Sequence, residues 1–218
     1  FDKNDKYKIL IIGDSYAVDL FVMLHYNKVL NKTFQFTHQR TNADDTSQII
    51  RNRIDADAII LTEQFYEDEV NADFFLKFKK KYVNDNQKLI IMGRPNEFIV
   101  GNYDPLTFIL IKNQDIQDLY TKSDYQKIDE HLYRILNDKV FRINSNIRKI
   151  ANDLKFIYLD RFDYACSDIN KTCKSTDSNG LPIYIDQGHL STHAVPIFNK
   201  LIIEKNWFKQ VNELAKNN

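Results

Sequence analysis

Short apolar runs alternate with longer amphipathic segments along most of this chain, and this alternation constrains the fold more than any other feature. The segment Ile9-Leu10-Ile11-Ile12 contains no polar position, which indicates a strand buried on both faces. We expect strands at Lys8–Ile12, Thr33–Thr37, Asp57–Thr62, Lys88–Gly93 and Lys155–Asp160. Strands separated by helices need crossover connections, which favour a parallel sheet covered on both sides. The sequence therefore predicts an α/β fold: a three-layer α/β/α sandwich with a five-stranded, mostly parallel sheet.

The segments between these runs carry apolar residues at helical spacing. We expect helices at Ala17–Leu30, Asp44–Arg53, Asn71–Tyr82, Asp129–Leu154 and Thr192–Ala215. The region Asn96–Asp124 is less regular and is expected to form a surface excursion. No linker-like stretch divides the chain, so residues 1–218 are predicted to form one domain of flavodoxin-like size.

The charge balance limits the classes of partner. The 30 Lys and Arg residues match the 30 Asp and Glu residues, giving a formal net charge of zero. Nucleic-acid-binding proteins usually carry a basic excess, so composition argues against a generic nucleic-acid binder. No run of 18 apolar residues occurs, so we expect no membrane-spanning segment within the chain. The first residue is Phe1, without a signal peptide, and we expect it to lie inside a longer gene product or after a processing site.

A candidate nucleophile follows the first strand. Gly13-Asp14-Ser15 comes directly after that strand and directly before a helix. Glycine permits a tight turn, and the N–H groups at a helix N-terminus stabilise negative charge. Ser15 is therefore placed where an acyl-transfer nucleophile belongs, with its own amide available to the oxyanion. The alternative is that Ser15 only caps the helix. We expect Asp14 to brace the turn by hydrogen bonding.

A candidate base lies near the other end of the chain. Asp186 precedes His189 by three residues, and an Asp at this spacing can orient an imidazole and stabilise the imidazolium. The alternative is a loop Asp followed by an ordinary His at a helix N-terminus. His193 lies one helical turn after His189, a spacing that can bind a metal. No third ligand is evident, so neither a metal nor another cofactor is predicted.

The two cysteines, Cys166 and Cys173, lie seven residues apart in a polar segment. Their number and closeness allow a small disulfide loop, which would place the chain outside the cytoplasm. The alternative is two free thiols.

Together these motifs resemble the SGNH, or GDSL-type, hydrolase superfamily. Gly13-Asp14-Ser15 stands after the first strand and Asp186-x-x-His189 before the last helix, as in that superfamily. The tail narrows the resemblance: the two cysteines, the segment Leu181–Asp186 and then His189-Leu190-Ser191 are similar to SGNH domains fused to acyltransferase-type-3 membrane proteins. Those domains O-acetylate bacterial cell-surface polysaccharides, such as lipopolysaccharide.

The resemblance implies a flavodoxin-like SGNH fold and a specific set of roles. Ser15 would be the nucleophile, His189 the base and Asp186 its orienting group, in a serine-dependent O-acyltransferase, most simply an O-acetyltransferase. The acceptor would be a hydroxyl of a surface polysaccharide or oligosaccharide. A fused transmembrane module would supply the acyl group. The domain would lie in the periplasm or at the outer face of the inner membrane, as the C-terminal part of a longer membrane protein.

The sequence departs from the superfamily in its oxyanion donors. The superfamily usually supplies a glycine after the second strand and an asparagine after the third, and neither is present here. The donors expected instead are the Ser15 amide, Gln64 and Asn42. Asp14, Arg94 and Asn96 are expected to line the site.

Two alternatives stay open, and the missing donors favour the second of them. In a carbohydrate acetylesterase, water would replace the sugar acceptor, and the acyl-enzyme chemistry would be the same. In a degenerate, non-catalytic SGNH domain, the site would only bind glycan.

Overall fold

A five-stranded parallel sheet forms the centre of the structure, a computed structural model that describes residues 1–2, 5–41, 46–101, 105–112 and 125–216. The strand order is β2-β1-β3-β4-β5, and every neighbouring pair is parallel. The strands are β1 (Tyr7–Gly13), β2 (Phe34–Arg40), β3 (Ala58–Thr62), β4 (Lys88–Met92) and β5 (Ile157–Leu159). The predicted α/β fold is confirmed, with a sheet that is parallel throughout.

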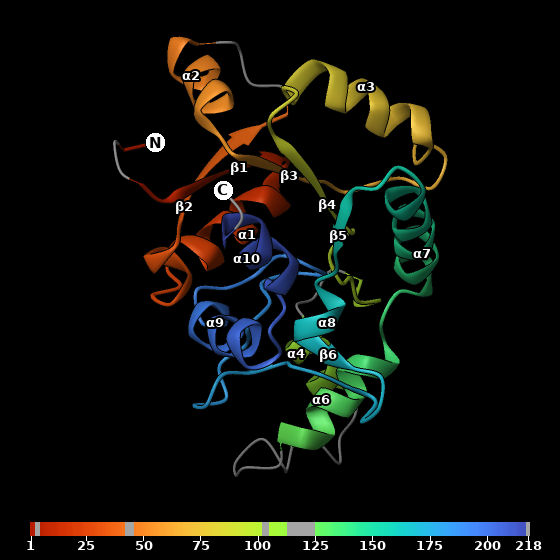
Figure 1. Ribbon diagram of the computed structural model, residues 1–218. Helices are drawn as coiled ribbons and strands as arrows, with labels where there is room; N and C mark the ends of the chain where they lie inside the picture. The colour runs from red at the N-terminus through yellow and green to blue at the C-terminus, as the bar shows by residue number, and fades with distance from the viewer. Residues whose placement is uncertain (3–4, 42–45, 102–104, 113–124, 217–218) are drawn as a thin grey trace.

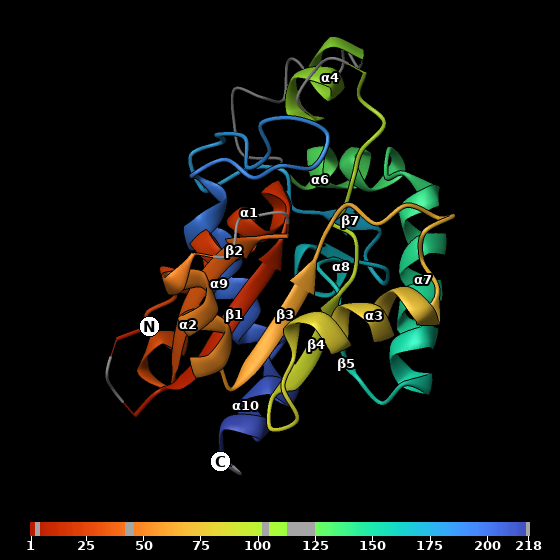
Figure 2. The same ribbon diagram turned by 90° about the horizontal axis from the view of Figure 1, so that it is seen from above.

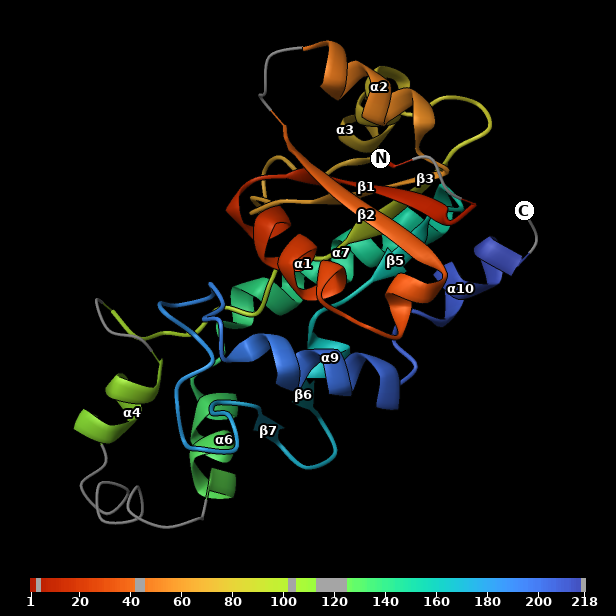
Figure 3. The same ribbon diagram turned by 90° about the vertical axis from the view of Figure 1, so that its left-hand side faces the viewer.

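Helices cover both faces of the sheet (Figure 1, Figure 3). One face carries α2 (Ser47–Asp55), α3 (Ala72–Tyr82) and α7 (Asp138–Asp153). The other carries α1 (Ser15–His25), α9 (Ala194–Glu204) and α10 (Lys209–Lys216). The remaining elements are the 3-10 helix η1 (Leu30–Lys32), α4 (Pro105–Lys112), α6 (Tyr125–Arg134), α8 (Phe162–Ala165), and a short hairpin of β6 (Cys166–Ser167) and β7 (Thr172–Cys173). None of the helices in these described segments is long and apolar enough to cross a membrane.

Two hydrophobic cores lie on opposite sides of the sheet because side chains alternate along a strand. In β1, Ile9 and Ile11 face the core shared with α1 and α9, whereas Leu10 and Ile12 face the core shared with α3 and α7. All four side chains are fully buried, as expected for a parallel sheet covered on both faces.

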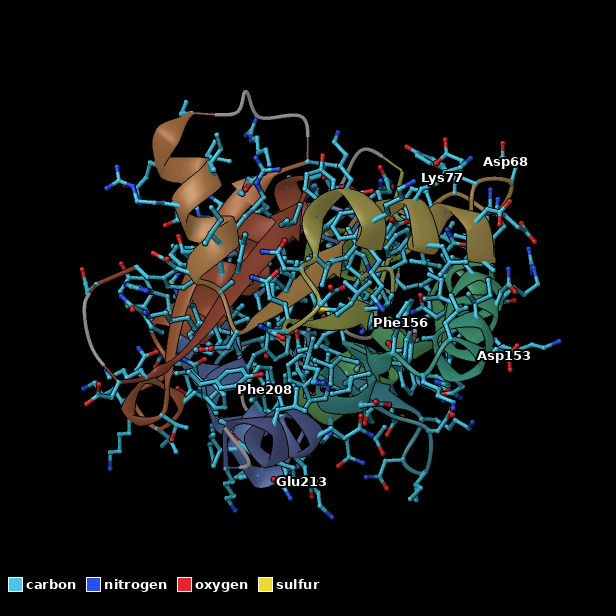
Figure 4. All side chains as sticks on the ribbon, turned by 45° about the horizontal axis from the view of Figure 1, so that its top comes forward. Asp68, Lys77, Asp153, Phe156, Phe208 and Glu213 are labelled. Atoms are coloured by element: carbon cyan, nitrogen blue, oxygen red, sulfur yellow. A yellow bond between two sulfur atoms is a disulfide. The ribbon has the colours of Figure 1, made fainter. Side chains whose placement is uncertain are left out.

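Figure 4 labels one aromatic residue from each of the two cores. Phe208 lies next to α10 and belongs to the first core, and Phe156 packs against the second. The labelled charged residues Asp68, Lys77, Asp153 and Glu213 are exposed.

The single long helix predicted over Asp129–Leu154 is wrong, because α6 and α7 are separate. Between them, Leu136 forms an antiparallel bridge with Phe98, and the Asn137 N–H donates to the Glu97 carbonyl at 2.9 Å. The Asn137 side chain then caps the first turn of α7. Pairing with the segment after β4 therefore takes the place of a continued helix.

The single closing helix predicted over Thr192–Ala215 is also wrong. The chain leaves α9 through Asn206, whose φ of 49° lies in the left-handed region and ends a helix. The indole N–H of Trp207 then donates to the Asp160 carbonyl at 2.7 Å. This buried bond holds the junction between α9 and α10 against the end of β5.

The helix predicted over Ala17–Leu30 is shorter than expected and begins earlier. It starts at Ser15 and ends at His25. Beyond it, the Asn27 side chain accepts the N–H groups of Val29 and Leu30, each at 3.1 Å. Asparagine favours such local turns over helix continuation.

The surface excursion predicted over Asn96–Asp124 is wrong for its first part. Asn96, Glu97, Phe98 and Val100 are buried, and the Phe98 N–H donates to the Gln187 carbonyl at 2.8 Å. This segment therefore supports the loop that carries His189. Farther along, α4 forms, and residues 113–124 lie outside the described residues.

The carboxyl ends of the strands gather at one edge of the sheet. Figure 2 shows the arrowheads of β1 and β3 directed toward the side where the blue loop before α9 lies. In open parallel sheets, ligands bind at this edge. The residues that follow β1, β3 and β4 therefore lie at the edge where a ligand is expected to bind.

Candidate active site

The turn between β1 and α1 presents Ser15 at the first position of the helix. A Cβ atom on Gly13 would lie 1.7 Å from the Thr62 carbonyl oxygen, so only glycine fits beside β3. Asp14 caps the helix: its carboxylate accepts the Tyr16 N–H at 2.9 Å and the Gln64 N–H at 2.8 Å. Asp14 thereby ties the turn to the end of β3 and leaves the Ser15 side chain exposed.

The structure brings Ser15, His189 and Asp186 into one hydrogen-bonded chain. The Ser15 Oγ lies 2.7 Å from His189 Nε2, and His189 Nδ1 lies 2.7 Å from Asp186 Oδ2. Ser15 and His189 are 174 residues apart in sequence, so the fold itself creates this contact. The arrangement can remove a proton from the serine hydroxyl and hold it on the imidazole.

Asp186 is fixed by its own loop. One carboxylate oxygen accepts the backbone N–H groups of Gly188 at 2.9 Å and of His189 at 2.8 Å. Partial burial raises the pKa of Asp186, but these N–H groups and the imidazole outweigh burial and bring the pKa below its usual value. Asp186 is therefore a carboxylate at neutral pH, ready to orient His189.

Tyr16 lies beneath the imidazole. The two rings are stacked with centroids 4.4 Å apart and planes 7° apart. The Tyr16 carbonyl accepts a hydrogen bond from the buried Arg161 guanidinium at 2.5 Å. The ring of Tyr16 therefore sets the plane in which His189 reaches both of its partners.

Asp19 adds a further connection between α1 and the loop of His189. Its carboxylate accepts the Leu190 N–H at 3.1 Å. Burial raises the pKa of Asp19, and the charge of Arg161 opposes this rise. Three residues of one helix, Ser15, Tyr16 and Asp19, thus contact two successive residues near the other end of the chain. Tyr16, Asp19 and Arg161 are not among the residues predicted from the sequence, because no local motif marks them.

A cleft of about 740 Å³ opens beside Ser15. The described residues that line it come from the ends of β1, β2 and β3 and from the loop after β3: Gly13, Asp14, Ser15, Arg40, Thr41, Glu63, Gln64, Tyr66 and Glu69. Its volume lies in the range of small-molecule sites. Ser15 can therefore meet a bound substrate.

Gln64 lies in this cleft, as an oxyanion donor must. Its backbone N–H is taken by Asp14, and its side-chain amide donates to Glu97 at 3.4 Å and accepts from the Tyr66 hydroxyl at 3.1 Å. An amide carries two N–H bonds, so one remains for a ligand. The N–H of Ser15 belongs to the first turn of α1, where N–H groups have no partner within the helix. Asn42 lies outside the described residues.

Arg94 and Asn96, which were expected to line the site, are not among the described residues that line this cleft. Arg94 is buried, donates to both carboxylate oxygens of Glu97 at 2.8 Å, and donates to the Phe65 carbonyl at 2.8 Å. The buried Asn96 amide contacts Cys166 Sγ at 3.5 Å. Both residues support the loops around the site.

Cys166 and Cys173 form the disulfide that the sequence allowed. It joins β6 to β7, with Cα atoms 4.0 Å apart, and both cysteines are buried. Neither cysteine lines the cleft beside Ser15.

Comparisons with known proteins identify the family and the fold of the chain. The family model for the SGNH domain (fused to AT3 domains) matches residues 1–203. None of the curated proteins matches the sequence.

Two solved structures show a similar fold. The periplasmic domain of the lipopolysaccharide acetyltransferase of Salmonella ser. Paratyphi A is 20% identical, with a TM-score of 0.61 over 94% of this chain and 85% of that chain. A carbohydrate acetylesterase from Sinorhizobium meliloti is 13% identical, with a TM-score of 0.50 over 92% of this chain and 98% of that chain. At these identities the likeness concerns the fold alone.

Proposed function

The chain belongs to the family of SGNH domains fused to AT3 domains, and we propose that it is a serine-dependent O-acyltransferase. It moves an acyl group, most simply acetyl, through acyl-Ser15 to a hydroxyl of a bacterial cell-surface polysaccharide. Residues 1–218 act as one domain outside the cytoplasm, and a fused membrane module supplies the acyl group. The observation that carries this proposal is the hydrogen-bonded chain from Ser15 through His189 to Asp186, with both distances at 2.7 Å.

The mechanism has two half-reactions. In the first, Ser15 Oγ attacks the acyl carbonyl while His189 Nε2 takes its proton, and the donor's leaving group departs with that proton. In the second, the acceptor hydroxyl gives its proton to His189 and attacks the acyl-serine, and the Ser15 oxygen recovers the proton. Asp186 holds the imidazole in the required tautomer and stabilises the imidazolium in each step.

Each half-reaction passes through a tetrahedral oxyanion. The N–H of Ser15 and the side-chain amide of Gln64 are the donors for that charge. Asn42 remains a third candidate donor. The positive end of α1 adds stabilisation at the same place.

A fluorophosphonate probe tests the nucleophile directly. Labelling should occur at Ser15 and vanish in Ser15→Ala. Ser145→Ala is a matched control, since Ser145 is another exposed serine, on α7, and its replacement should leave labelling intact. A folded wild-type protein that stays unlabelled would contradict the proposal.

The exposure of Ser15 keeps carbohydrate acetylesterase activity as a second candidate, because water can reach an exposed acyl-serine. Measuring acetate release and acetyl transfer to added oligosaccharide in one reaction distinguishes the two activities. Transfer that exceeds release supports the transferase. A purely glycan-binding role would be indicated if Ser15→Ala left glycan acylation in cells unchanged.

A further inference from the structure

The cleft beside Ser15 has a lining that selects among acceptors. We propose that it is a subsite for an uncharged sugar, in which the ring of Tyr66 is the stacking platform and the carboxylates of Glu63 and Glu69 disfavour anionic glycans. This inference rests on the proposed function and narrows its substrate class.

The polarity of the lining points to a hydroxyl-rich ligand. Among the nine described residues that line the cleft, Tyr66 alone offers a large apolar surface. A lipid or aryl ligand would need an apolar slot, whereas a sugar needs hydrogen-bonding groups around one apolar platform. Thr41, Gln64 and Glu63 supply hydrogen-bonding groups close to Ser15.

Tyr66 is held as a preformed platform. Its side chain is 47% exposed, yet its hydroxyl donates to Gln64 Oε1 at 3.1 Å. The guanidinium of Arg94 lies 5.7 Å from the ring centroid and is itself fixed by Glu97 and the Phe65 carbonyl. A tyrosine ring offers a rigid contact area, and little side-chain entropy is lost when a ligand binds to it. The contacts with Gln64 and Arg94 already restrict the Tyr66 ring, so that loss on binding is smaller still.

Charge makes the cleft selective. Among the described residues, its lining contains the carboxylates of Asp14, Glu63 and Glu69 and a single cation, Arg40. The Asp14 carboxylate accepts two backbone N–H hydrogen bonds, and these dipoles partly compensate its negative charge. Burial raises the pKa of Glu63, and the hydrogen bond from Thr41 opposes this rise. The remaining negative field repels a uronate or phosphate group and leaves an uncharged sugar unaffected.

Binding can be measured without chemistry in the Ser15→Ala protein. The probes are neutral galacto- and gluco-oligosaccharides and their uronate counterparts of the same length, followed by saturation-transfer NMR and titration calorimetry at low salt. We expect at least one neutral probe to bind and its uronate counterpart to bind about tenfold more weakly, with a gap that narrows as salt screens the carboxylates. Equal or tighter uronate binding, or no binding by any neutral probe, would overturn the proposal.

Variants then test the two parts of the subsite. In the Ser15→Ala protein, the further substitution Tyr66→Ala should weaken binding of the neutral oligosaccharide about tenfold. Tyr66→Phe should keep most of that affinity. Tyr26→Ala is the matched control, because Tyr26 is exposed at the end of α1 and is not among the cleft-lining residues. Glu69→Gln should reduce the difference in affinity between a neutral oligosaccharide and its uronate counterpart. Unchanged binding in Tyr66→Ala would contradict the platform, and an unchanged gap in Glu69→Gln would contradict the charge filter.

A separate measurement distinguishes failure of this inference from failure of the proposed function. Acylation of Ser15 by p-nitrophenyl acetate needs no sugar. If that acylation occurs and the acyl group then passes equally well to uronate and neutral sugars, only the subsite proposal fails. If Ser15 is never acylated, the proposed function fails instead.

Discussion

At the scale of single residues, Tyr16 links Ser15 to His189, the proposed nucleophile and base. It directly follows Ser15 in sequence, and its ring lies 4.4 Å from the His189 ring in a nearly parallel stack. An aromatic face also attracts the positive charge that the imidazole gains as it takes the proton. Tyr16 is therefore a positioning residue with two effects, one geometric and one electrostatic.

Two substitutions of Tyr16 distinguish the contribution of its ring from that of its hydroxyl. Tyr16→Phe keeps the stacked ring and should retain most of kcat. Tyr16→Leu fills part of the volume without the flat face, and we expect kcat for p-nitrophenyl acetate to fall about 10- to 100-fold. Steady-state kinetics together with thermal unfolding checks this. Equal losses in both variants, or a loss in Tyr16→Leu that merely follows unfolding, would contradict the positioning role.

Asp186 gives a second prediction, on activity. Asp186→Asn keeps an acceptor for the N–H groups of Gly188 and His189 but cannot hold the imidazole in the same tautomer. We expect kcat to fall by about a thousandfold or more, with fluorophosphonate labelling slowed to a similar degree. A loss of less than tenfold would show that His189 does not depend on this carboxylate.

The same substitution has a pH-dependent effect on stability. The pKa of Asp186 is lower in the folded chain than its usual value. A carboxyl of this kind stabilises the fold above its unfolded pKa, and the contribution is lost as the pH falls through the folded pKa. The difference in unfolding free energy between wild type and Asp186→Asn should therefore shrink below about pH 4. Urea unfolding at pH 7, 5 and 3 measures this, and a constant difference would contradict it.

The sequence was informative about residues whose chemistry is local. Ser15, Asp186 and His189 stand in short motifs with a recognisable order along the chain, so they were named in advance as candidates. Tyr16, Asp19 and Arg161 could not be found in this way, because their contacts join segments more than a hundred residues apart. Tyrosine after serine has no meaning until the fold places an imidazole above it.

At the scale of elements, periodicity located the strands well and the ends of helices poorly. Four of the five strands have strong apolar runs, β2 alternates apolar and polar residues, and all five form. The breaks after α6 and α9 depend on tertiary contacts, namely the bridge of Leu136 with Phe98 and the bond of Trp207 with Asp160. Such contacts leave no trace in local helical spacing, which continues through both breaks.

The hairpin of β6 and β7 permits a prediction at this scale. The disulfide between Cys166 and Cys173 closes a loop at a sequence separation of seven residues. Loop-closure entropy for so short a loop gives a stabilisation of about 2–3 kcal/mol. The double variant Cys166→Ser, Cys173→Ser should have a free energy of unfolding lower by this amount, measured by urea denaturation, and dithiothreitol should destabilise the wild type equally. Dithiothreitol should not affect the double variant, and a wild type indifferent to it would contradict the stabilising role.

At the scale of the whole molecule, a neutral chain carries an uneven distribution of charge. The formal net charge is zero, yet the described residues that line the cleft beside Ser15 carry three carboxylates and one guanidinium. The strand ends place Asp14 and Glu63 together because β1 and β3 are neighbours in the sheet. The zero net charge argued only against nucleic-acid binding. The strand order, by gathering carboxylates beside Ser15, gives the proposed site a preference for uncharged ligands.

This distribution of charge also predicts which acyl donors can acylate Ser15 in the isolated chain. Coenzyme A carries several phosphates, which the carboxylates of the cleft repel, whereas p-nitrophenyl acetate is uncharged. We expect the isolated chain to form acetyl-Ser15 from p-nitrophenyl acetate at least about a hundredfold faster than from acetyl-CoA at equal concentration and low salt. Mass spectrometry of the intact protein measures the acetyl group gained, and Ser15→Ala is the control for acetylation elsewhere. In a family of SGNH domains fused to AT3 domains, such a result would support the proposal that the membrane module supplies the acyl group. Comparable rates from the two donors would show instead that the chain can use acetyl-CoA without that module.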